Sequence, residues 1–428
     1  PFVSFATTLV KEAVNTSEIP ITGNTHKPNE NILSNTKNVQ HATTTKVQET
    51  SVDSYEVMPI REPGDSNFPF EDKRTPRVFN TSVDIFKEIP RELDPRNPNN
   101  PPLKKILFWN DAYGQKHFGF GFGQEPFHRA GCRVKTCMTT GNRNRFPLEE
   151  FDAVIWHFRS NDKSLPSYRS PHTRYVFWMM ESASHLYGNI KQYNGTFNWT
   201  FTYRLDSDFP NPYGKVYRRH EPLPMTHVDL SKKTKFAAWF VSNCATIGGR
   251  RSFIDTLEKW IDIDIYGACG ALKCDRKDQW STCYKMLEKD YKFYFSFENS
   301  LCKDYATEKF FNILKLNIIP VVYGLGSYHL QAPPHSYINA LNFPSAKALA
   351  DYLLYLSKNQ TAYEEYFQWK RFHYQPTQWE KVARPWCQLC EQLHIDNTKN
   401  VYDLHKWFVE DSKCKTRSSP EIHKLISE

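Results

Sequence analysis

The sequence predicts an α/β protein with two Rossmann-like domains that face a cleft, preceded by an unfolded N-terminal segment. Short, continuous apolar runs of strand length recur from residue 103 onward, and amphipathic helical patterns alternate with them in the second half of the chain. Residues 6–54, in contrast, contain no aromatic side chain. Alternating strands and helices are typical of parallel sheets that helices cover on both faces.

Residues 1–102 are predicted to be a stem or linker that is largely disordered. Residues 6–54 are rich in Thr, Asn, Lys, Glu and Val, so they cannot bury enough apolar surface to fold. A Pro-rich stretch over residues 88–102 then stiffens the approach to the first strand. No run of about 18 or more apolar residues marks a membrane span.

Two consecutive series of strands divide the rest of the chain. The first domain, residues 103–228, has apolar runs at 105–109, 153–157 and 175–179. The second domain, residues 229–380, has apolar runs at 236–241, 263–266, 293–297 and 318–323, with helical patterns at 252–260, 307–316, 346–357 and 363–372. Glu221-Pro-Leu-Pro breaks the periodicity at the predicted junction. Residues 381–428 are predicted to be a C-terminal tail that carries Cys387-Gln-Leu-Cys390.

The formal net charge of +8 is spread along the chain. Lys and Arg form no stripe and no aromatic-basic motif of the kind that nucleic-acid-binding proteins carry, so we predict no nucleic-acid partner. We assign the excess charge to phosphate binding and surface solvation.

Ten cysteines together with five N-glycosylation sequons, at Asn15, Asn80, Asn194, Asn198 and Asn359, indicate an oxidising secretory lumen. Cys387-x-x-Cys390 is compatible with half of a zinc site or with a redox pair. However, no second Cys-x-x-Cys and no His pair at ligand spacing accompanies it. We therefore favour structural disulfides, whose connectivity the spacing does not reveal.

The segment over residues 292–310 is the most informative part of the chain. Alternating phenylalanines predict a strand, Glu298-Asn-Ser interrupts the pattern, and Thr307 begins a helical one. Ligands bind at the carboxyl ends of such strands, with anionic groups at the helix start. Lys309 adds a cation to that first turn. We expect a nucleotide phosphate site here; the alternative is an ordinary βα unit with a solvated Glu308-Lys309 face.

Several motifs follow one another in order over roughly residues 103–390. They are Trp178-Met-Met-Glu-Ser, Tyr203-Arg-Leu-Asp-Ser-Asp, Pro212-Tyr-Gly, Trp239-Phe-Val-Ser-Asn with Arg250, Phe295-Ser-Phe-Glu-Asn-Ser, Lys303-Asp-Tyr-Ala-Thr-Glu-Lys-Phe-Phe, Ile319-Pro-Val-Val-Tyr-Gly and Ala332-Pro-Pro-His-Ser-Tyr-Ile-Asn-Ala. In this order they resemble the α1,3-fucosyltransferases, glycosyltransferase family 10. The resemblance implies a GT-B fold and an inverting transfer of fucose from GDP-fucose to a sugar hydroxyl.

Sugar transfer from a nucleotide needs a base for the acceptor hydroxyl and positive charge for the departing diphosphate. Glu181 follows the apolar run at 175–179, so we place it at the carboxyl edge of the first sheet. The resemblance implies that Glu181 is the base. The alternative is that Glu181 caps a helix beginning at Ser182.

The cations of the second domain, Arg250 and Lys309, each stand at a predicted helix start, a combination that binds pyrophosphate. The resemblance implies donor contacts by Ser242, Asn243, Arg250, Asn299, Tyr305, Glu308 and Lys309, with Tyr213 as a weaker addition. Arg251 is the alternative to Arg250, because the loop before them varies in length. Glu308 is expected to bind fucose or ribose hydroxyls; otherwise it is a surface carboxylate.

Asp206-Ser-Asp208 is the Asp-x-Asp pattern by which a different class of glycosyltransferases holds Mn²⁺. The same residues are also common in turns before proline. We expect no metal and no cofactor requirement, because Arg250 and Lys309 neutralise the diphosphate. The alternatives are a metal-dependent sugar transferase that uses Asp206 and Asp208, and a secreted glycan-binding protein without turnover.

The expected acceptor is a GlcNAc residue of an N-glycan or related glycan, with His157 and Arg159 on the acceptor side. Family members that act on antennae carry His-His-Arg where this chain has His157-Phe158-Arg159, which favours the core GlcNAc. The resemblance also implies a Golgi type II membrane protein. Its N-terminal anchor would precede this luminal chain.

Overall fold

The structure is a computed structural model that describes residues 102–274, 282–395 and 400–427. The predicted stem lies outside these residues, as do the sequons at Asn15 and Asn80. The rest of the predicted α/β architecture is confirmed by two parallel sheets of five strands each.

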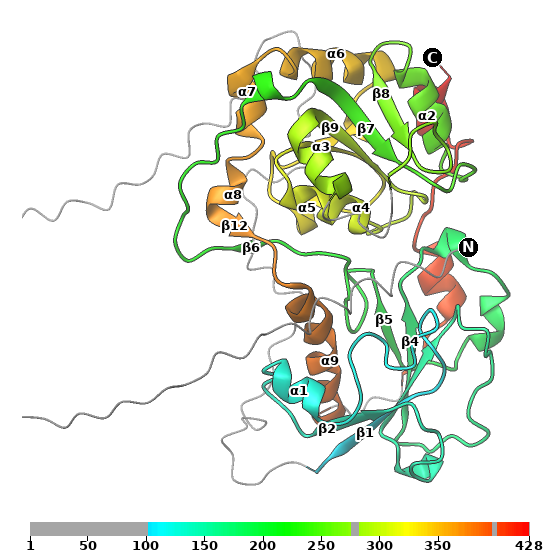
Figure 1. Ribbon diagram of the computed structural model, residues 1–428. Coiled ribbons are helices and arrows are strands. Elements are labelled where there is room, and N and C mark those ends of the chain that lie inside the picture. Colours follow the sequence, from blue (N-terminus) through cyan, green and yellow to red (C-terminus); the bar gives the residue numbers. More distant parts are fainter. Residues whose placement is uncertain (1–101, 275–281, 396–399, 428) are drawn as a thin grey trace, which may run out of the picture. The chain divides into compact units, whose positions relative to one another are not determined.

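The first sheet has the strand order β2-β1-β3-β4-β5 (Figure 1). Its strands are β1 (Lys104–Phe108), β2 (Cys137–Thr140), β3 (Ala153–His157), β4 (Arg174–Met179) and β5 (Trp199–Thr202). The predicted runs at 105–109, 153–157 and 175–179 correspond to β1, β3 and β4. Every residue of β3 and β4 is buried, which explains why these strands appear in the sequence as continuous apolar runs.

The second sheet has the strand order β11-β10-β9-β7-β8. Its strands are β7 (Lys235–Phe240), β8 (Ile263–Tyr266), β9 (Tyr291–Phe297), β10 (Ile319–Tyr323) and β11 (Ile338–Asn339). Two short strands, β6 (Tyr217–Arg218) and β12 (His373–Tyr374), pair separately as an antiparallel ribbon. This ribbon joins the segment that leaves the first sheet to the segment that returns from the second.

Ten α-helices are described. They are α1 (Glu125–Arg129), α2 (Arg250–Leu257), α3 (Tyr284–Asp290), α4 (Glu308–Phe311), α5 (Tyr328–Gln331), α6 (Ala346–Leu356), α7 (Gln360–Glu365), α8 (Trp369–Phe372), α9 (Gln378–Ile395) and α10 (Pro420–Ile426). The helix predicted over 307–316 is α4 followed by a 3-10 turn, Ile313–Lys315, and the one predicted over 363–372 is divided between α7 and α8. The helix predicted over 346–357 matches α6, with Ser345 as its N-cap.

The two sheets share one topology. Counted within its own sheet, each has the order 2-1-3-4-5, so the direction in which successive strands are added to the sheet reverses between β1 and β3 in the first sheet and between β7 and β9 in the second. Open parallel sheets bind ligands at this switch point, beyond the carboxyl ends of the strands. The topology therefore defines one candidate crevice in each sheet.

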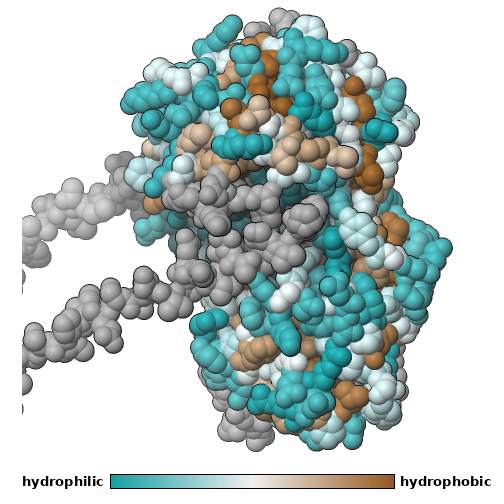
Figure 2. Space-filling view, turned by 45° about the vertical axis from the view of Figure 1, so that its right-hand side comes forward, coloured by the Kyte–Doolittle hydropathy of each residue, from teal (hydrophilic) through white to brown (hydrophobic). Residues whose placement is uncertain are grey.

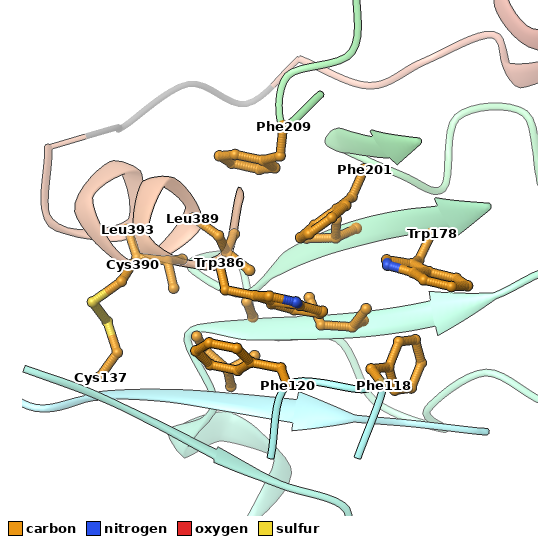
Figure 3. Packing of buried hydrophobic residues seen from close by; sticks show 14 of the residues in the cluster. Phe118, Phe120, Cys137, Trp178, Phe201, Phe209, Trp386, Leu389, Cys390 and Leu393 are labelled. Carbon is orange, nitrogen blue, oxygen red and sulfur yellow. A yellow bond between two sulfur atoms is a disulfide. The ribbon is translucent and has the colours of Figure 1, made fainter. Parts of the chain in front are cut away.

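Helix α9 lies in the segment predicted as a tail, yet it packs on the first sheet beside α1 and β1 (Figure 1). Trp386 is 1% exposed and reaches from α9 to the rings of Phe120 and Phe201, at centroid distances of 5.4 and 4.5 Å (Figure 3). Two disulfides, Cys132–Cys387 and Cys137–Cys390, fasten the same helix to the neighbourhood of β2. Residues 378–395 thus complete the core of the first sheet.

All ten cysteines are paired. The remaining disulfides are Cys244–Cys269, Cys274–Cys283 and Cys302–Cys414. His394 Nε2 lies 4.0 Å from Cys137 Sγ, but the two sulfurs near this histidine are bonded to each other. The preference for structural disulfides over a zinc site or redox pair at Cys387-x-x-Cys390 is therefore confirmed.

The visible face of the molecule is predominantly hydrophilic, and its hydrophobic residues form small, separate patches (Figure 2). None of the helices among the described residues is both long enough and apolar enough to cross a membrane.

Candidate active site

Arg250 occupies the crevice of the second sheet. It is the first residue of α2 and is 3% exposed. One guanidinium nitrogen donates to the carbonyl of Phe297 at the end of β9, and another donates to the carbonyl of Asn243 just after β7, both at 2.8 Å. Nε has no partner among the described residues. Arg250 therefore lies at the switch point as a buried cation, and the hydrogen-bond acceptors of its guanidinium among the described residues are carbonyl oxygens.

The neighbouring Arg251 has different partners, which are carboxylates on α2 and at its C-terminal end. The Arg251 guanidinium pairs with Asp255 at 2.7 Å and lies 3.7 Å from Glu258, both on the same helical surface. Of the two arginines that the sequence left open, Arg250 is the one placed at the strand ends.

Lys309 lies in the loop-to-helix junction that follows β9. Its Nζ is 3.4 Å from the buried carboxylate of Glu298 and 3.1 Å from that of Glu308. Burial by itself disfavours the charged form of Lys309, but the two carboxylates outweigh burial and raise its pKa above the ordinary value. Lys309 is therefore charged, and its side chain remains 27% exposed.

Glu298 is a structural partner that the sequence did not single out. It is fully buried and accepts from the backbone N–H of Thr307 at 2.7 Å and from the Thr307 hydroxyl at 2.9 Å. These bonds fix the start of α4 and hold Lys309 in place. The first turn of α4 thus presents Glu308 and Lys309 beside the end of β9.

Glu181 stands two residues after β4, at the carboxyl edge of the first sheet as predicted. Its Oε2 accepts a hydrogen bond of 3.1 Å from the hydroxyl of Tyr305, which belongs to the loop after β9. A 3-10 helix, Ala183–His185, follows with Ser182 at the N-cap position. Glu181 therefore does not occupy the cap, and its carboxylate faces the loop after β9 instead.

Tyr213 approaches Glu181 from the first sheet. Its hydroxyl donates to the carbonyl of Met180 at 2.8 Å, and its ring lies 6.2 Å from that of Tyr305. The next residue, Gly214, lies directly against Phe311 of α4, where an added Cβ would come within 2.1 Å of the ring. This close approach, which only glycine permits, brings Tyr213 into the site.

Tyr305 itself is set by an unusual turn. Asp304 has a φ of +62°, in the left-handed region that Asp tolerates better than most residues. Its carboxylate accepts from the backbone N–H of Leu205 at 3.1 Å and from the hydroxyl of Ser327 at 2.6 Å. Asp304 is therefore a strained residue that is hydrogen-bonded to a loop from each sheet, and it orients Tyr305 toward Glu181.

His185 lies in the loop after β4 and contacts the loop after β9. The sequence did not single it out. Its Nδ1 is 2.7 Å from the hydroxyl of Ser300, and its Nε2 is 3.4 Å from the amide nitrogen of Asn299. The hydroxyl of Ser182 also bonds to that of Ser300, at 2.7 Å. The predicted donor residue Asn299 thus belongs to a network that reaches the loop of Glu181.

His157 marks the crevice of the first sheet, between β1 and β3. Its Nδ1 donates to the carbonyl of Asp111 at 2.8 Å, and its ring lies 4.6 Å from Tyr113 and 5.0 Å from Trp178. Burial lowers the pKa of His157 to about 4, against the opposing effect of that hydrogen bond. His157 is therefore neutral, with an Nε2 that has no partner among the described residues.

Arg159, the other predicted acceptor-side residue, donates to the carbonyl of His185 at 3.5 Å. Its guanidinium also lies 4.7 Å from the exposed ring of Tyr187. Arg159 is therefore connected to the Glu181 loop. Ser242 is exposed in the loop after β7, and Asn243 contributes its carbonyl to Arg250.

The two carboxylates of Asp206-Ser-Asp208 have separate protein partners. Asp206 accepts two hydrogen bonds from the buried guanidinium of Arg204, at 2.8 and 2.7 Å, and one from Lys303 at 2.8 Å. Asp208 accepts from Thr200 and from the hydroxyl of Tyr402. These contacts support the turn interpretation of the motif, because each carboxylate is already neutralised or hydrogen-bonded.

The carboxylate of Glu181, two cations and a set of hydroxyl and amide groups thus meet at the strand ends. Such a site can bind a sugar diphosphate and accept a proton from an alcohol. Comparison with known proteins supports the same assignment. Residues 101–214 match "Fucosyltransferase, N-terminal", and residues 230–407 match "Glycosyltransferase family 10 (fucosyltransferase) C-term".

Two relatives from Drosophila melanogaster cover most of the chain. α-(1,3)-Fucosyltransferase C is 35% identical over 346 residues, which are 73% of this chain and 80% of that protein. Glycoprotein 3-α-L-fucosyltransferase A is 34% identical over 363 residues, which are 82% of this chain and 68% of that protein. The chain belongs to glycosyltransferase family 10, the α1,3-fucosyltransferases, and the predicted resemblance is confirmed.

Among solved structures, a crystal structure of an α1,3-fucosyltransferase with GDP aligns with a TM-score of 0.46 at 17% identity. The alignment covers 70% of this chain and 93% of that one.

Proposed function

We propose that this protein is an inverting α1,3-fucosyltransferase that moves fucose from GDP-fucose to a GlcNAc residue of a glycan, with Glu181 as the base. The observation that carries the proposal is the placement of Glu181 opposite the loop of Asn299 and Tyr305. Arg250 and Lys309 supply positive charge beside the same loop. Base and leaving-group site are thus contributed by different sheets.

The reaction is a single displacement. Glu181 removes the proton from the acceptor hydroxyl as its oxygen bonds to C1 of fucose, and the bond between C1 and the diphosphate oxygen breaks. GDP leaves with the electron pair. Because the acceptor attacks opposite the departing diphosphate, a β-linked donor gives an α-linked product.

Arg250 and Lys309 stabilise the charge that develops on the diphosphate. Arg250 is already fixed at the switch point by two carbonyl groups, so it needs little reorganisation when the nucleotide binds. Ser242, Asn243, Asn299 and Glu308 complete the proposed donor site with hydroxyl, amide and carboxylate groups. The only small molecules this reaction requires are GDP-fucose and the glycan.

The proposed acceptor is the core GlcNAc of an N-glycan rather than an antennal GlcNAc. Phe158, which replaces the middle histidine of His-His-Arg, is 1% exposed and packs 5.9 Å from the ring of Trp156. A polar side chain there would lose this packing. One relative is named a glycoprotein 3-α-L-fucosyltransferase, which agrees with a protein-linked glycan as acceptor.

We also propose that the protein works in the Golgi lumen, as the luminal part of a type II membrane protein. The pairing of all ten cysteines supports an oxidising compartment. Expression of the full-length protein with a luminal protease-protection assay tests this proposal, and exposure of the catalytic region to cytosolic protease would contradict it.

The test is incubation with GDP-fucose and a panel of core and antennal glycans, read by mass, with and without EDTA. We expect a mass gain of one fucose on the core glycan and substantial activity in EDTA. Complete loss in EDTA that Mn²⁺ restores would favour the metal-dependent alternative at Asp206 and Asp208. Glycan binding without fucose transfer or GDP release would favour a binding protein.

A further inference from the structure

The side chain of His185 is the contact point between the Glu181 loop and the loop after β9. Ser300 Oγ lies 2.7 Å from His185 Nδ1, and Asn299 Nδ2 lies 3.4 Å from His185 Nε2. The backbone carbonyl of His185 also accepts from Arg159. One residue therefore touches groups assigned to the donor side, the acceptor side and the loop of the base.

The contacts of His185, with the Asn299 amide oriented as in the structure, correspond to one tautomer. The amide nitrogen of Asn299 is a donor, so Nε2 of His185 must offer its lone pair. Nδ1 then carries the proton and donates it to Ser300 Oγ.

The surroundings keep His185 in this neutral form. Burial lowers the pKa of His185, and the nearby cations Arg159, Lys309 and Arg250 act in the same direction, while Glu181 opposes them. The neutral imidazole is thus compatible with both contacts at once. Its role is to hold the geometry, and it needs no proton exchange with a substrate.

A second bond makes the connection rigid. Ser182, the residue after Glu181, bonds to the same Ser300 hydroxyl at 2.7 Å, and both serines are fully buried. Ser182, His185 and Ser300 form a closed triangle, since Ser182 Oγ is also 3.3 Å from His185 Nδ1. A displacement of Ser300 would therefore act on both Ser182 and His185, which lie on either side of the short 3-10 helix after Glu181.

We propose that His185 is a positioning residue that couples the donor-binding loop, through Ser300 and Asn299, to the placement of Glu181. The inference rests on the proposed function, in which Asn299 binds the donor and Glu181 is the base. It predicts that loss of the imidazole weakens GDP binding and slows turnover, because both loops lose a common contact.

His185→Ala should lower kcat by about ten- to a hundredfold, the scale of a misplaced reacting group, and raise the Kd for GDP several-fold. His185→Asn retains a donor near the position of Nδ1, so it should preserve more activity than His185→Gln, which retains only the position of Nε2. His172→Ala, at an exposed histidine in the same domain, is the matched control and should change neither value.

A double-mutant cycle with Ser300→Ala tests the connection itself. If His185 acts through Ser300, the double variant should have about the same kcat as either single variant. Thermal melting of each variant checks that the protein is folded. Additive losses, or a His185→Ala variant within about twofold of the wild type in kcat and GDP affinity, would overturn the proposal.

Measurements on the wild-type protein distinguish the proposed fucosyl transfer from the proposed coupling through His185. A wild-type protein that binds GDP but transfers no fucose would contradict the proposed function, while the GDP affinities of the variants would still test the coupling. Turnover in the wild type with no change in the variants would contradict the coupling alone. A wild-type protein that binds no GDP would contradict both.

Discussion

The Tyr305 hydroxyl donates a hydrogen bond of 3.1 Å to the Glu181 carboxylate, and the two residues lie in loops that follow strands of different sheets. Tyr305 was predicted as a donor contact, yet its hydroxyl reaches the candidate base. Its ring is 1% exposed and packs 4.9 Å from Tyr203, so the hydroxyl has little freedom to move away. The candidate base is thus oriented by the same loop that is proposed to hold the nucleotide.

Tyr305→Phe removes this hydrogen bond and keeps the ring. We expect kcat to fall about tenfold or more, because a hydrogen bond to a charged group is worth roughly 1.5–3 kcal/mol. Tyr168→Phe, at an exposed tyrosine, is the control. A kcat within about twofold of the wild type in Tyr305→Phe would show that this bond does not act on Glu181.

Arg250→Ala and Lys309→Ala should each weaken GDP binding by about tenfold or more, because charge-assisted contacts to phosphate are lost. Isothermal titration calorimetry measures the effect, with melting curves to establish folding. Arg251→Ala is the matched control, since its guanidinium pairs with Asp255 on the helix surface. Equal loss in Arg251→Ala and Arg250→Ala would contradict the assignment of Arg250.

The stability of the protein should fall as the pH is lowered from about 6.5 toward 4. Burial lowers the pKa of His157 to about 4, so below its ordinary value of 6.5 the unfolded chain binds a proton that the folded chain does not. The titration of His157 alone should lower the free energy of unfolding by about 2 kcal/mol between pH 7 and pH 5. Urea unfolding at several pH values measures it.

His157→Gln should flatten this pH dependence, whatever its effect on stability at neutral pH. His172→Gln, at an exposed histidine, should leave the slope unchanged. His335 contributes a similar slope, since burial also lowers its pKa to about 4. A wild-type slope in His157→Gln would contradict the neutral, buried state of His157.

Trp386→Ala should lower the free energy of unfolding by about 3–5 kcal/mol, the usual cost of removing a buried aromatic ring. The exposed Trp260 serves as control, and Trp260→Ala should cost less than about 1 kcal/mol. Denaturant unfolding measures both. A small effect of Trp386→Ala would mean that α9 does not complete the core of the first sheet.

The strands could be predicted because burial on both faces makes them continuous apolar runs, as in β3 and β4. Helix α9 was missed for a physical reason. Its apolar face is complementary to strands more than 250 residues earlier, as the disulfide between Cys137 and Cys390 illustrates, with a sequence separation of 253. No local sequence pattern can indicate a packing partner at that sequence separation.

In the candidate site, too, residues marked by a local sequence pattern could be predicted, and residues defined by long-range contacts could not. Glu181 and Arg250 could be placed because each follows or begins a recognisable element. His185 could not, because its role depends on Ser300, 115 residues away. The available signal was its place four residues after Glu181, in a motif that was interpreted for its carboxylate alone.

The central claim is that Glu181 is the base of a fucosyl transfer. Glu181→Gln keeps the size of the side chain and its place opposite Tyr305 but removes the charge, so GDP binding should stay within about threefold of the wild type. The most direct measurement is the kcat of folded Glu181→Gln with GDP-fucose and a core glycan, which should fall at least about a hundredfold. Near-normal turnover in that variant would contradict the account.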